Sequence, residues 1–281
     1  MIRALALLPL PLLYAVCGAL ALLARLFHWR AGFVRDGIAR CLPEASEAER
    51  RRIAAGFYGY LGELVAEAVH GASIDPADLA DRLRFDNPEA VEKVLKGGKR
   101  VMLLAAHHCN WEWLLLRCST AFGTPLVAAY KPASREAANR ALTEVRSRFG
   151  ATMVPAKQIV QHLIEQRGAV KLLALVADQS PAASSDQQSW LPFFGKETAF
   201  FRGPGWIGAK MGYQPFFIAM RRVGRGRYAV RFVPLLAPGE RADPDRIVES
   251  YVRAVEAQAR EYPAQYFWAY NRWKRARRVY D

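Results

Sequence analysis

The sequence lacks the cysteine spacing of a metal site or of a disulfide framework. Its 281 residues contain four cysteines, Cys17, Cys41, Cys109 and Cys118, which are neither paired nor grouped at metal-ligand spacing. Scattered single cysteines are typical of a protein in a reducing compartment. The histidines on helix-like segments also have no ligand partners nearby, so we expect no metal and no bound cofactor.

Internal repeats and low-complexity stretches are absent, and acidic residues are few. The chain has 26 acidic against 40 basic residues, a formal charge of +14, with 52% hydrophobic and 11% aromatic residues. This composition excludes a disordered chain and fits one large α/β domain. The positive charge favours anionic partners such as phospholipid headgroups or phosphorylated substrates. A nucleic-acid role would need a recognisable binding module or stacking surface, and neither is visible.

One basic cluster stands out near the C-terminal end of the sequence. It lies in "NRWKRARR" and comprises Arg272, Lys274, Arg275, Arg277 and Arg278. A run of like charges is usually a solvated face that attracts anions. We therefore expect this cluster to be exposed and to meet lipid phosphates or the anionic membrane surface.

Charge is missing altogether between Ala4 and Ala24. That length is about the ~20 residues that a helix needs to cross the hydrocarbon core. Arg25, Arg30 and Arg35 follow directly, which favours a retained anchor with the body in the cytosol. We expect a single transmembrane helix within an anchor over 1–28 and a catalytic domain over 29–281. A cleaved secretory signal ending near Ala19-Leu20-Ala21 is the alternative.

Strand-like and helix-like segments alternate through the middle of the chain. Strands are predicted at 100–106, 125–130, 151–154 and 169–178, with helices at 110–123, 135–150 and 156–168 between them. Two earlier helices are predicted, one at 46–71, where Ser46 and Glu49 have the spacing of a capping box, and one at 87–98, with Pro88 in its first turn. A helix at 203–212, a hairpin at 214–235 that turns at Gly224–Gly226 and a helix at 244–263 follow a polar stretch at 179–202. This order predicts a mostly parallel or mixed sheet flanked by helices.

Chemically reactive side chains stand where three of these strands end. One strand ends at His107-His108, another at Tyr130-Lys131 and a third at Asp178-Gln179. Open parallel sheets gather functional groups at the carboxyl ends of their strands. As a purely structural residue, Asp178 would only cap the turn that follows its strand.

The stretch "AAHHCNWEW" pairs a histidine with a carboxylate five residues later. If Asn110 caps the next helix, Glu112 falls in its first turn and can reach back to His107. A carboxylate on one ring nitrogen fixes the tautomer and makes the other nitrogen a better base. A solvated helix start is the alternative interpretation. Cys109 as a nucleophile is a further one, although no obvious base serves it.

Several stretches together resemble a known family. "HHCNWEW" resembles the His-x4-Asp/Glu signature of the lysophospholipid acyltransferase superfamily, in the form found in bacterial lipid A late acyltransferases. "YKPASREAANRALTEVRSRFGA", "VADQSP", "WLPFFGKETAFFRGP" and "YPAQYFWAYNRWK" are similar to that family's later segments, in the same order. With the N-terminal anchor, the resemblance covers nearly the whole chain. It implies a glycerolphosphate-acyltransferase-like arrangement of the sheet and helices.

The resemblance implies roles for individual residues. His107 would be the general base and Glu112 its partner, with Arg146, Asp178 and Gln179 as further site residues. Arg148 is the alternative to Arg146, because the register of that helix is open by a turn. Lys131 departs from the more usual arginine of the family, and it can still meet a phosphate as a point charge. Thr198 and Arg202 would line the acyl or acceptor channel, and Asn110, Arg146 or helix N–H groups would stabilise the oxyanion.

The function implied is transfer of a fatty acyl chain from an acyl thioester to a hydroxyl of a lipid A precursor. The donor would be acyl carrier protein, with coenzyme A possible, and the place the cytoplasmic side of the bacterial inner membrane. An acyltransferase of the same superfamily with another acceptor is the alternative: a phosphatidylinositol mannoside, an ornithine lipid or an aryl polyene. A non-catalytic basic protein that binds membrane or nucleic acid is the rival from a different class.

Overall fold

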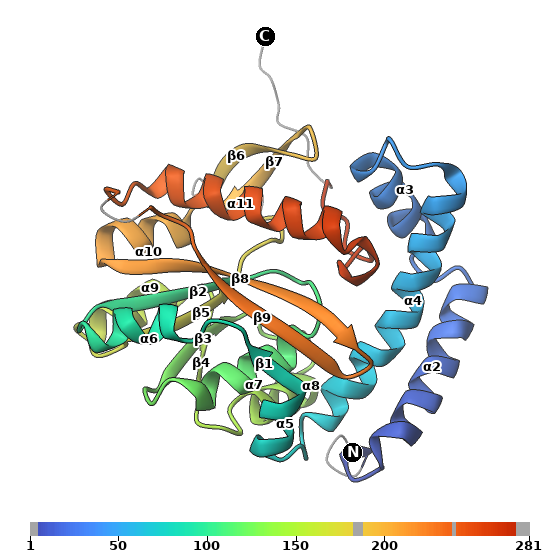
Figure 1. The fold of residues 1–281 in the computed structure, drawn as a ribbon, viewed down its shortest axis with the longest axis horizontal. Coiled ribbons are helices and arrows are strands. Elements are labelled where there is room, and N and C mark those ends of the chain that lie inside the picture. Colours follow the sequence, from blue (N-terminus) through green and yellow to red (C-terminus); the bar gives the residue numbers. More distant parts are fainter. Residues whose placement is uncertain (1–4, 182–187, 238–239, 274–281) are drawn as a thin grey trace.

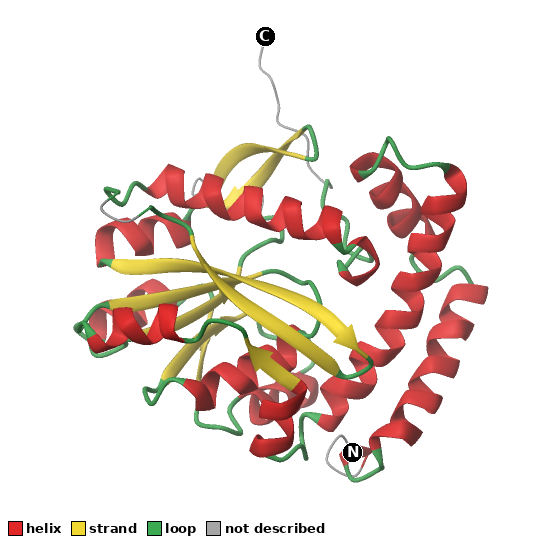
Figure 2. Ribbon diagram, in the orientation of Figure 1, coloured by secondary structure: helices red, strands yellow, loops and turns green. Residues whose placement is uncertain are grey.

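The computed structural model describes residues 5–181, 188–237 and 240–273. It has an α/β fold, in which a twisted seven-stranded sheet lies between layers of helices (Figure 1, Figure 2). The prediction of a mostly parallel sheet flanked by helices is therefore confirmed.

The secondary structure follows the predicted alternation, and the described residues also form elements that were not predicted: the strands β1, β6 and β7 and the helices α3, α5 and η1. The helices are α2 (Leu10–Leu26), α3 (Ala31–Cys41), α4 (Glu47–His70), α5 (Pro76–Arg82), α6 (Glu89–Lys96), α7 (Trp111–Ala121), α8 (Glu136–Arg146), α9 (Ile159–Glu165), α10 (Gly203–Met211), α11 (Pro244–Glu261) and the short 3-10 helix η1 (Pro263–Gln265). The strands are β1 (Leu83–Phe85), β2 (Arg100–Ala105), β3 (Leu126–Tyr130), β4 (Thr152–Pro155), β5 (Leu172–Val176), β6 (Gln188–Phe193), β7 (Lys196–Phe201), β8 (Tyr213–Gly224) and β9 (Arg227–Pro234).

The large sheet has the strand order β1-β9-β8-β2-β5-β3-β4. Strands β8, β2, β5, β3 and β4 run parallel, and β9 turns back against β8 in the predicted hairpin. In the register of the two central strands, Ala105 at the end of β2 faces Val176 at the end of β5. The residues that follow these two strands therefore leave the sheet at the same level.

Alternating side chains of β2 build a core on each face of the sheet. Met102 and Leu104 pack with α9, α10 and α11 on one face. Val101 and Leu103 pack with α5, α6 and α7 on the other. A central strand of a parallel sheet is buried on both faces, which is why β2 is a continuous apolar run.

Helix α4 lies beside the turn of the β8–β9 hairpin, and α2 packs along its outer side (Figure 1). Helix α4 begins at a capping box, in which the Ser46 hydroxyl accepts a hydrogen bond from the Glu49 backbone N–H and the Glu49 carboxylate accepts one from the Ser46 backbone N–H. The spacing of these two residues predicted this start.

The predicted single membrane span over 4–24 is not confirmed. Among the described helices, none alone is long and apolar enough to cross a membrane; α2 and α3 pass that test only together, as a pair bent by 83°. Two residues with positive φ, His28 and Arg30, lie at the bend.

The polar stretch at 179–202 contains an unpredicted element. Strands β6 and β7 form an antiparallel hairpin, whose tight turn places Phe194 and Gly195 at positive φ. Phe193 and Phe200 are buried in the core beneath it, so this stretch folds onto the domain through its aromatic residues.

Candidate active site

The parallel register of β2 and β5 brings two of the predicted site residues together. His107 lies two residues beyond the end of β2, and Asp178 lies two residues beyond the end of β5. Because Ala105 faces Val176 in the ladder, the next equivalent positions are these two residues. The meeting of a histidine and an acid at this edge of the sheet therefore follows from strand pairing.

Asp178 holds His107 at two points. Its Oδ1 lies 2.6 Å from the ring Nδ1, and its Oδ2 accepts a hydrogen bond from the His107 backbone N–H at 3.1 Å. The side chain of Asp178 is only 3% exposed, whereas that of His107 is 22% exposed. Burial raises the pKa of Asp178, but the nearby imidazole and the hydrogen bonds outweigh this, and the pKa is lowered overall. The acid is therefore ionised at neutral pH and its partner ring is reachable.

The other ring nitrogen of His107 points toward Gln179. The amide Nε2 of Gln179 lies 3.3 Å from His107 Nε2. With a proton on Nδ1 directed at the carboxylate, Nε2 carries the lone pair and acts as an acceptor. Such an imidazole is suited to take a proton from a hydroxyl.

The predicted contact between Glu112 and His107 does not form. His107 pairs with Asp178, and Glu112 pairs with Arg146. As expected, Asn110 caps α7 through a hydrogen bond from the Trp113 amide, and Glu112 falls in the first turn. Its carboxylate, however, accepts two hydrogen bonds from Arg146 on α8, at 2.6 and 2.8 Å. The planar guanidinium matches both carboxylate oxygens, so this pairing satisfies Glu112.

Trp111 contacts both halves of this arrangement. Its ring stands edge-on to His107, with 5.0 Å between ring centroids, and its indole N–H donates to Glu112 at 3.1 Å. The Glu112–Arg146 ion pair is therefore adjacent to the His107–Asp178 pair, while the two pairs remain chemically separate.

A distant segment closes the turn that carries His107. The backbone N–H of Phe267 donates to the His107 carbonyl at 3.0 Å, and the N–H of Cys109 donates to the Gln265 carbonyl at 3.1 Å. His108 and Tyr266 form an isolated antiparallel bridge between these contacts. The site is thus built from the ends of two strands, the start of α7 and the segment after η1.

Comparison with known proteins identifies the family. The family model described as bacterial lipid A biosynthesis acyltransferase matches residues 1–275. The chain belongs to this family. It is also similar to the lipid A biosynthesis lauroyltransferase of Escherichia coli (strain K12), with 24% identity over 273 residues, which cover 95% of this chain and 87% of the relative. The protein is accordingly an enzyme that transfers acyl groups.

Two other residues near the turn of this acyltransferase, Asn110 and Cys109, are buried and hydrogen-bonded within the fold. Asn110 is fully buried, and its amide nitrogen donates to Glu67 at 2.7 Å. Cys109 is buried at positive φ, and burial raises the pKa of its thiol far above the usual range. A thiol in that state is a poor nucleophile, which argues against the cysteine alternative.

The remaining predicted residues have partners or surroundings of their own among the described contacts. Lys131 is exposed just after β3. Arg148 donates to carbonyl groups at the end of α4, including that of Ser73, so it supports the fold while Arg146 forms the ion pair. Thr198 is buried in β7, where it accepts a hydrogen bond from the Trp273 indole at 2.9 Å. Arg202 is exposed and pairs with Asp245 at 3.2 Å.

The basic cluster predicted as a solvated face is only partly described, and the described part is buried. Arg272 donates to the Ser180 hydroxyl at 2.7 Å and to the Ala199 carbonyl at 2.8 Å, and its guanidinium lies 4.1 Å from the Phe200 ring centroid. The expectation of exposure is therefore wrong for this residue. Arg272 instead fixes the chain just after Asp178-Gln179, and Lys274, Arg275, Arg277 and Arg278 lie outside the described residues.

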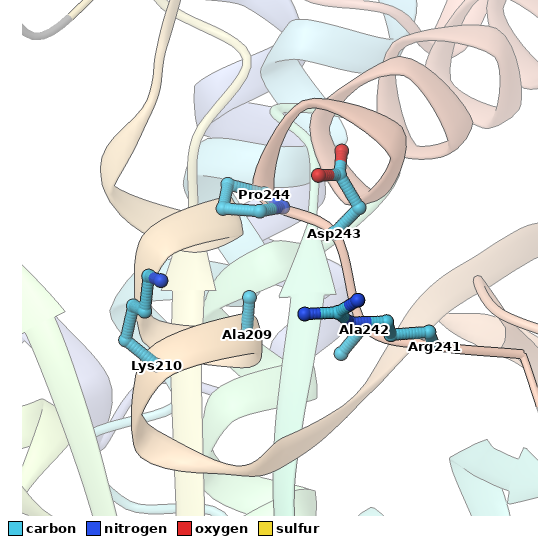
Figure 3. A pocket seen from close by; sticks show the side chains of 6 residues that line it. All are labelled: Ala209, Lys210, Arg241, Ala242, Asp243 and Pro244. Atoms are coloured by element: carbon cyan, nitrogen blue, oxygen red, sulfur yellow. The ribbon is translucent and has the colours of Figure 1, made fainter.

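One hollow of about 550 Å³ lies away from this site (Figure 3). It is lined by the end of α10 and the start of α11, with Lys210, Arg241 and Asp243 contributing charge. Because α10 leads into the beginning of β8, the hollow is at the amino edge of the parallel strands. His107 is at the opposite, carboxyl edge, so this hollow is not part of the His107 site.

Proposed function

We propose that this enzyme transfers a fatty acyl chain from an acyl carrier protein thioester to a hydroxyl of a lipid A precursor. The reaction would take place at the cytoplasmic face of the bacterial inner membrane. The observation that carries the proposal is the imidazole of His107, held by Asp178 at 2.6 Å and partly exposed on its other side. Family membership and the lauroyltransferase relative support the acceptor class.

In the proposed mechanism, His107 is the general base. Its Nε2 takes the proton of the acceptor hydroxyl as that oxygen attacks the thioester carbonyl. The tetrahedral intermediate then breaks its carbon–sulfur bond, and the thiol of the donor leaves with the proton from the imidazolium. A thioester is already activated, so the enzyme supplies orientation, proton transfer and charge stabilisation.

Asp178 takes the orienting role in this proposal, in place of Glu112. A buried, ionised carboxylate on Nδ1 holds the ring in the required tautomer and stabilises the imidazolium. Glu112 remains in the proposed site as the partner of Arg146, which it holds beside Trp111 and His107. Gln179 shares Nε2, and the acceptor hydroxyl would take the place of its amide at that nitrogen.

The start of α7 is the proposed source of oxyanion stabilisation. The amide of Asn110 is directed at Glu67, and both hydrogen-bonding nitrogens of Arg146 are directed at Glu112. Backbone N–H groups at a helix N-terminus carry partial positive charge and favour a developing anion. These groups follow directly after the turn that carries His107.

The test is an assay of purified protein with a tetra-acylated lipid A precursor. Donors of graded chain length would be offered both as acyl carrier protein thioesters and as coenzyme A thioesters. We expect one further ester-linked chain on the precursor, detected by mass spectrometry. A folded protein that reacts with no donor would overturn the acceptor assignment.

Acceptors of other classes remain the second candidate, because the chemistry at His107 would be the same. Phosphatidylinositol mannoside, ornithine lipid and aryl polyene acceptors can be offered in the same assay. In a strain that lacks the gene, loss of one secondary chain from lipid A supports the first candidate. Unchanged lipid A with a lost chain on another lipid would support the second.

A further inference from the structure

We propose that α2 attaches the enzyme to the membrane by lying along the surface of a single leaflet, without crossing the bilayer. The outward-facing side chains of α2 would contact the acyl chains of an anionic phospholipid leaflet. This deepens the membrane part of the proposed function and rests on it. It also replaces the single-pass anchor expected from the sequence.

Helix α2 has two apolar stripes, one buried against the domain and one facing outward. Its buried stripe consists of Leu10, Leu13, Cys17 and Ala21. Its outward stripe consists of Leu12, Val16, Leu20 and Leu23, which are 46–59% exposed. The solvent-facing side of a surface helix is normally polar. An outward stripe made wholly of leucine and valine therefore calls for an apolar environment.

The buried stripe fastens α2 to α4 along its length. At the crossing, a Cβ on Gly62 would lie 2.9 Å from the Cys17 carbonyl oxygen, so the two backbones touch. Tyr14 donates to the buried carboxylate of Glu67 at 2.9 Å. Beyond the other end of α2, Tyr58 donates to the Trp29 carbonyl at 2.6 Å. Helix α2 is therefore part of the folded domain and follows the orientation of α4.

Charged groups of the domain lie beside α2 and make a crossing costly. Glu63 on α4 pairs with Arg222 at 2.8 Å and with Arg225 at 2.9 Å, and the Arg225 guanidinium lies over the Tyr14 ring at 5.3 Å. A transmembrane α2 would carry this cluster into the hydrocarbon, where charged side chains are strongly disfavoured. An α2 that lies on the surface leaves the cluster in water.

The length of α2 leads to the same conclusion. Its 17 residues at about 1.5 Å per residue give roughly 25 Å, which is less than the ~30 Å of a hydrocarbon core. The chain then bends by 83° into α3, whose inner side is buried in the domain through Val34, Ile38 and Cys41. The bend turns the chain back to the protein and does not extend the helix.

Residues at the bend are suited to the headgroup layer. Trp29 and Phe33 are exposed, and the guanidinium of Arg30 lies 5.9 Å and 5.2 Å from their ring centroids. Tryptophan is enriched at the membrane–water boundary, and arginine there meets lipid phosphate. Arg25 and Arg35 add charge on either side, so the leaflet bound would be anionic.

The first experiment determines the side on which the N-terminal region lies. A Leu5→Cys variant, at an exposed position before α2, would be treated with a membrane-impermeant maleimide in intact spheroplasts. We expect labelling only after lysis, whereas a spanning helix would expose residue 5 on the periplasmic side and give labelling before lysis. The four native cysteines are buried. Arg51→Cys, at an exposed position on α4, is the matched control for the cytosolic side.

The second experiment removes the outward stripe. A Leu12→Gln/Leu20→Gln variant should bind vesicles of phosphatidylglycerol and phosphatidylethanolamine about 10–100-fold more weakly, since two leucines no longer enter lipid. Ile164→Gln, an equally exposed apolar position on α9, is the control and should bind normally. Unchanged binding of the double variant would overturn the proposal.

A measurement without membranes separates this proposal from the proposed function. With donor and acceptor dispersed in detergent, the double variant should transfer acyl groups at the rate of the unmodified enzyme. Loss of vesicle binding with retained transfer supports the membrane attachment alone. If neither protein shows transfer in detergent while the vesicle result holds, the proposed function fails and the attachment stands.

Discussion

Two adjacent histidines in this enzyme have opposite surroundings. His107 faces an ionised carboxylate on one side and is partly exposed on the other. His108 is buried, with its ring between the Gln258 amide at 2.6 Å and the Tyr262 carbonyl at 3.2 Å. Burial is the main cause that lowers the pKa of His108, to about 4, so it stays neutral. The chemical role of a histidine therefore depends on its partners, which a sequence motif does not reveal.

The largest expected effect is the loss of turnover when His107, the more exposed of the two histidines, is replaced. His107→Ala should lower kcat on the order of 10²–10⁴-fold, because the acceptor hydroxyl would lose the proposed general base. The far-ultraviolet circular dichroism and the melting temperature should stay close to those of the unmodified enzyme. His162→Ala on α9 is the control. Retained turnover in His107→Ala would show that the two histidines differ only structurally.

The second prediction compares the two candidate carboxylate partners. Asp178→Asn should lower kcat by about 10²-fold or more, and the acid limb of its pH–rate profile should move to lower pH. The reason is that a neutral amide stabilises the imidazolium less than a carboxylate does. In Glu112→Gln the acid limb should stay in place, since this residue is bound to Arg146. A shift in Glu112→Gln and none in Asp178→Asn would restore the partner predicted from the sequence.

The third prediction concerns the buried histidine and stability. Because burial lowers the pKa of His108 to about 4 in the fold from its ordinary value of 6.5, the unfolded chain binds its proton first as pH falls. The corresponding stability is complete above about pH 6.5 and is lost between there and pH 4. At ~1.36 kcal/mol per pH unit, the loss amounts to roughly 3 kcal/mol.

The measurement for this prediction is chemical denaturation of the unmodified enzyme and of His108→Gln at pH 7.5 and pH 5. The difference in unfolding free energy between the two pH values should shrink in the variant. An equal pH dependence in both proteins would mean that His108 is not the titrating group.

The smallest expected effect extends the comparison to a second buried acid. Glu67 resembles Asp178 in burial, but it accepts hydrogen bonds from Tyr14, Tyr228 and Asn110, and its surroundings contain no imidazole partner among the described contacts. Tyr14→Phe should lower the unfolding free energy by about 1–2 kcal/mol and leave the pH–rate profile unchanged. A displaced profile would make Glu67 part of the chemistry and remove the contrast with Asp178.

Local signals in the sequence predicted most of the elements. The capping box at Ser46, the Pro88 start of α6 and the glycines of the β8–β9 turn are short-range features, and each begins or ends an element near the expected residue. The β6–β7 hairpin was missed because its strands mix polar and aromatic residues without a clear apolar alternation. The predicted single N-terminal span is not confirmed, and hydropathy alone does not show that α2 packs on α4.

The site was predictable where it depends on strand ends and unpredictable where it depends on side-chain direction. Parallel pairing places His107 next to Asp178 once the strands are known. The direction of the Glu112 side chain, by contrast, is set by its ion pair with Arg146, which is 34 residues away and on another helix. Arg272 looked like one of a basic run, and only tertiary packing shows its burial against Phe200.

The turn around His107 has a consequence for the order of events during biosynthesis. Its backbone amide and carbonyl partners come from residues 265–267, and Cys109 and Gln265 are 156 positions apart. On the ribosome, the nascent chain therefore exposes this turn without its partners through most of translation. Contacts of such long range form late. Release of a prematurely terminated polypeptide would leave the histidine on an unsupported loop, so a message truncated before these codons should yield an inert product.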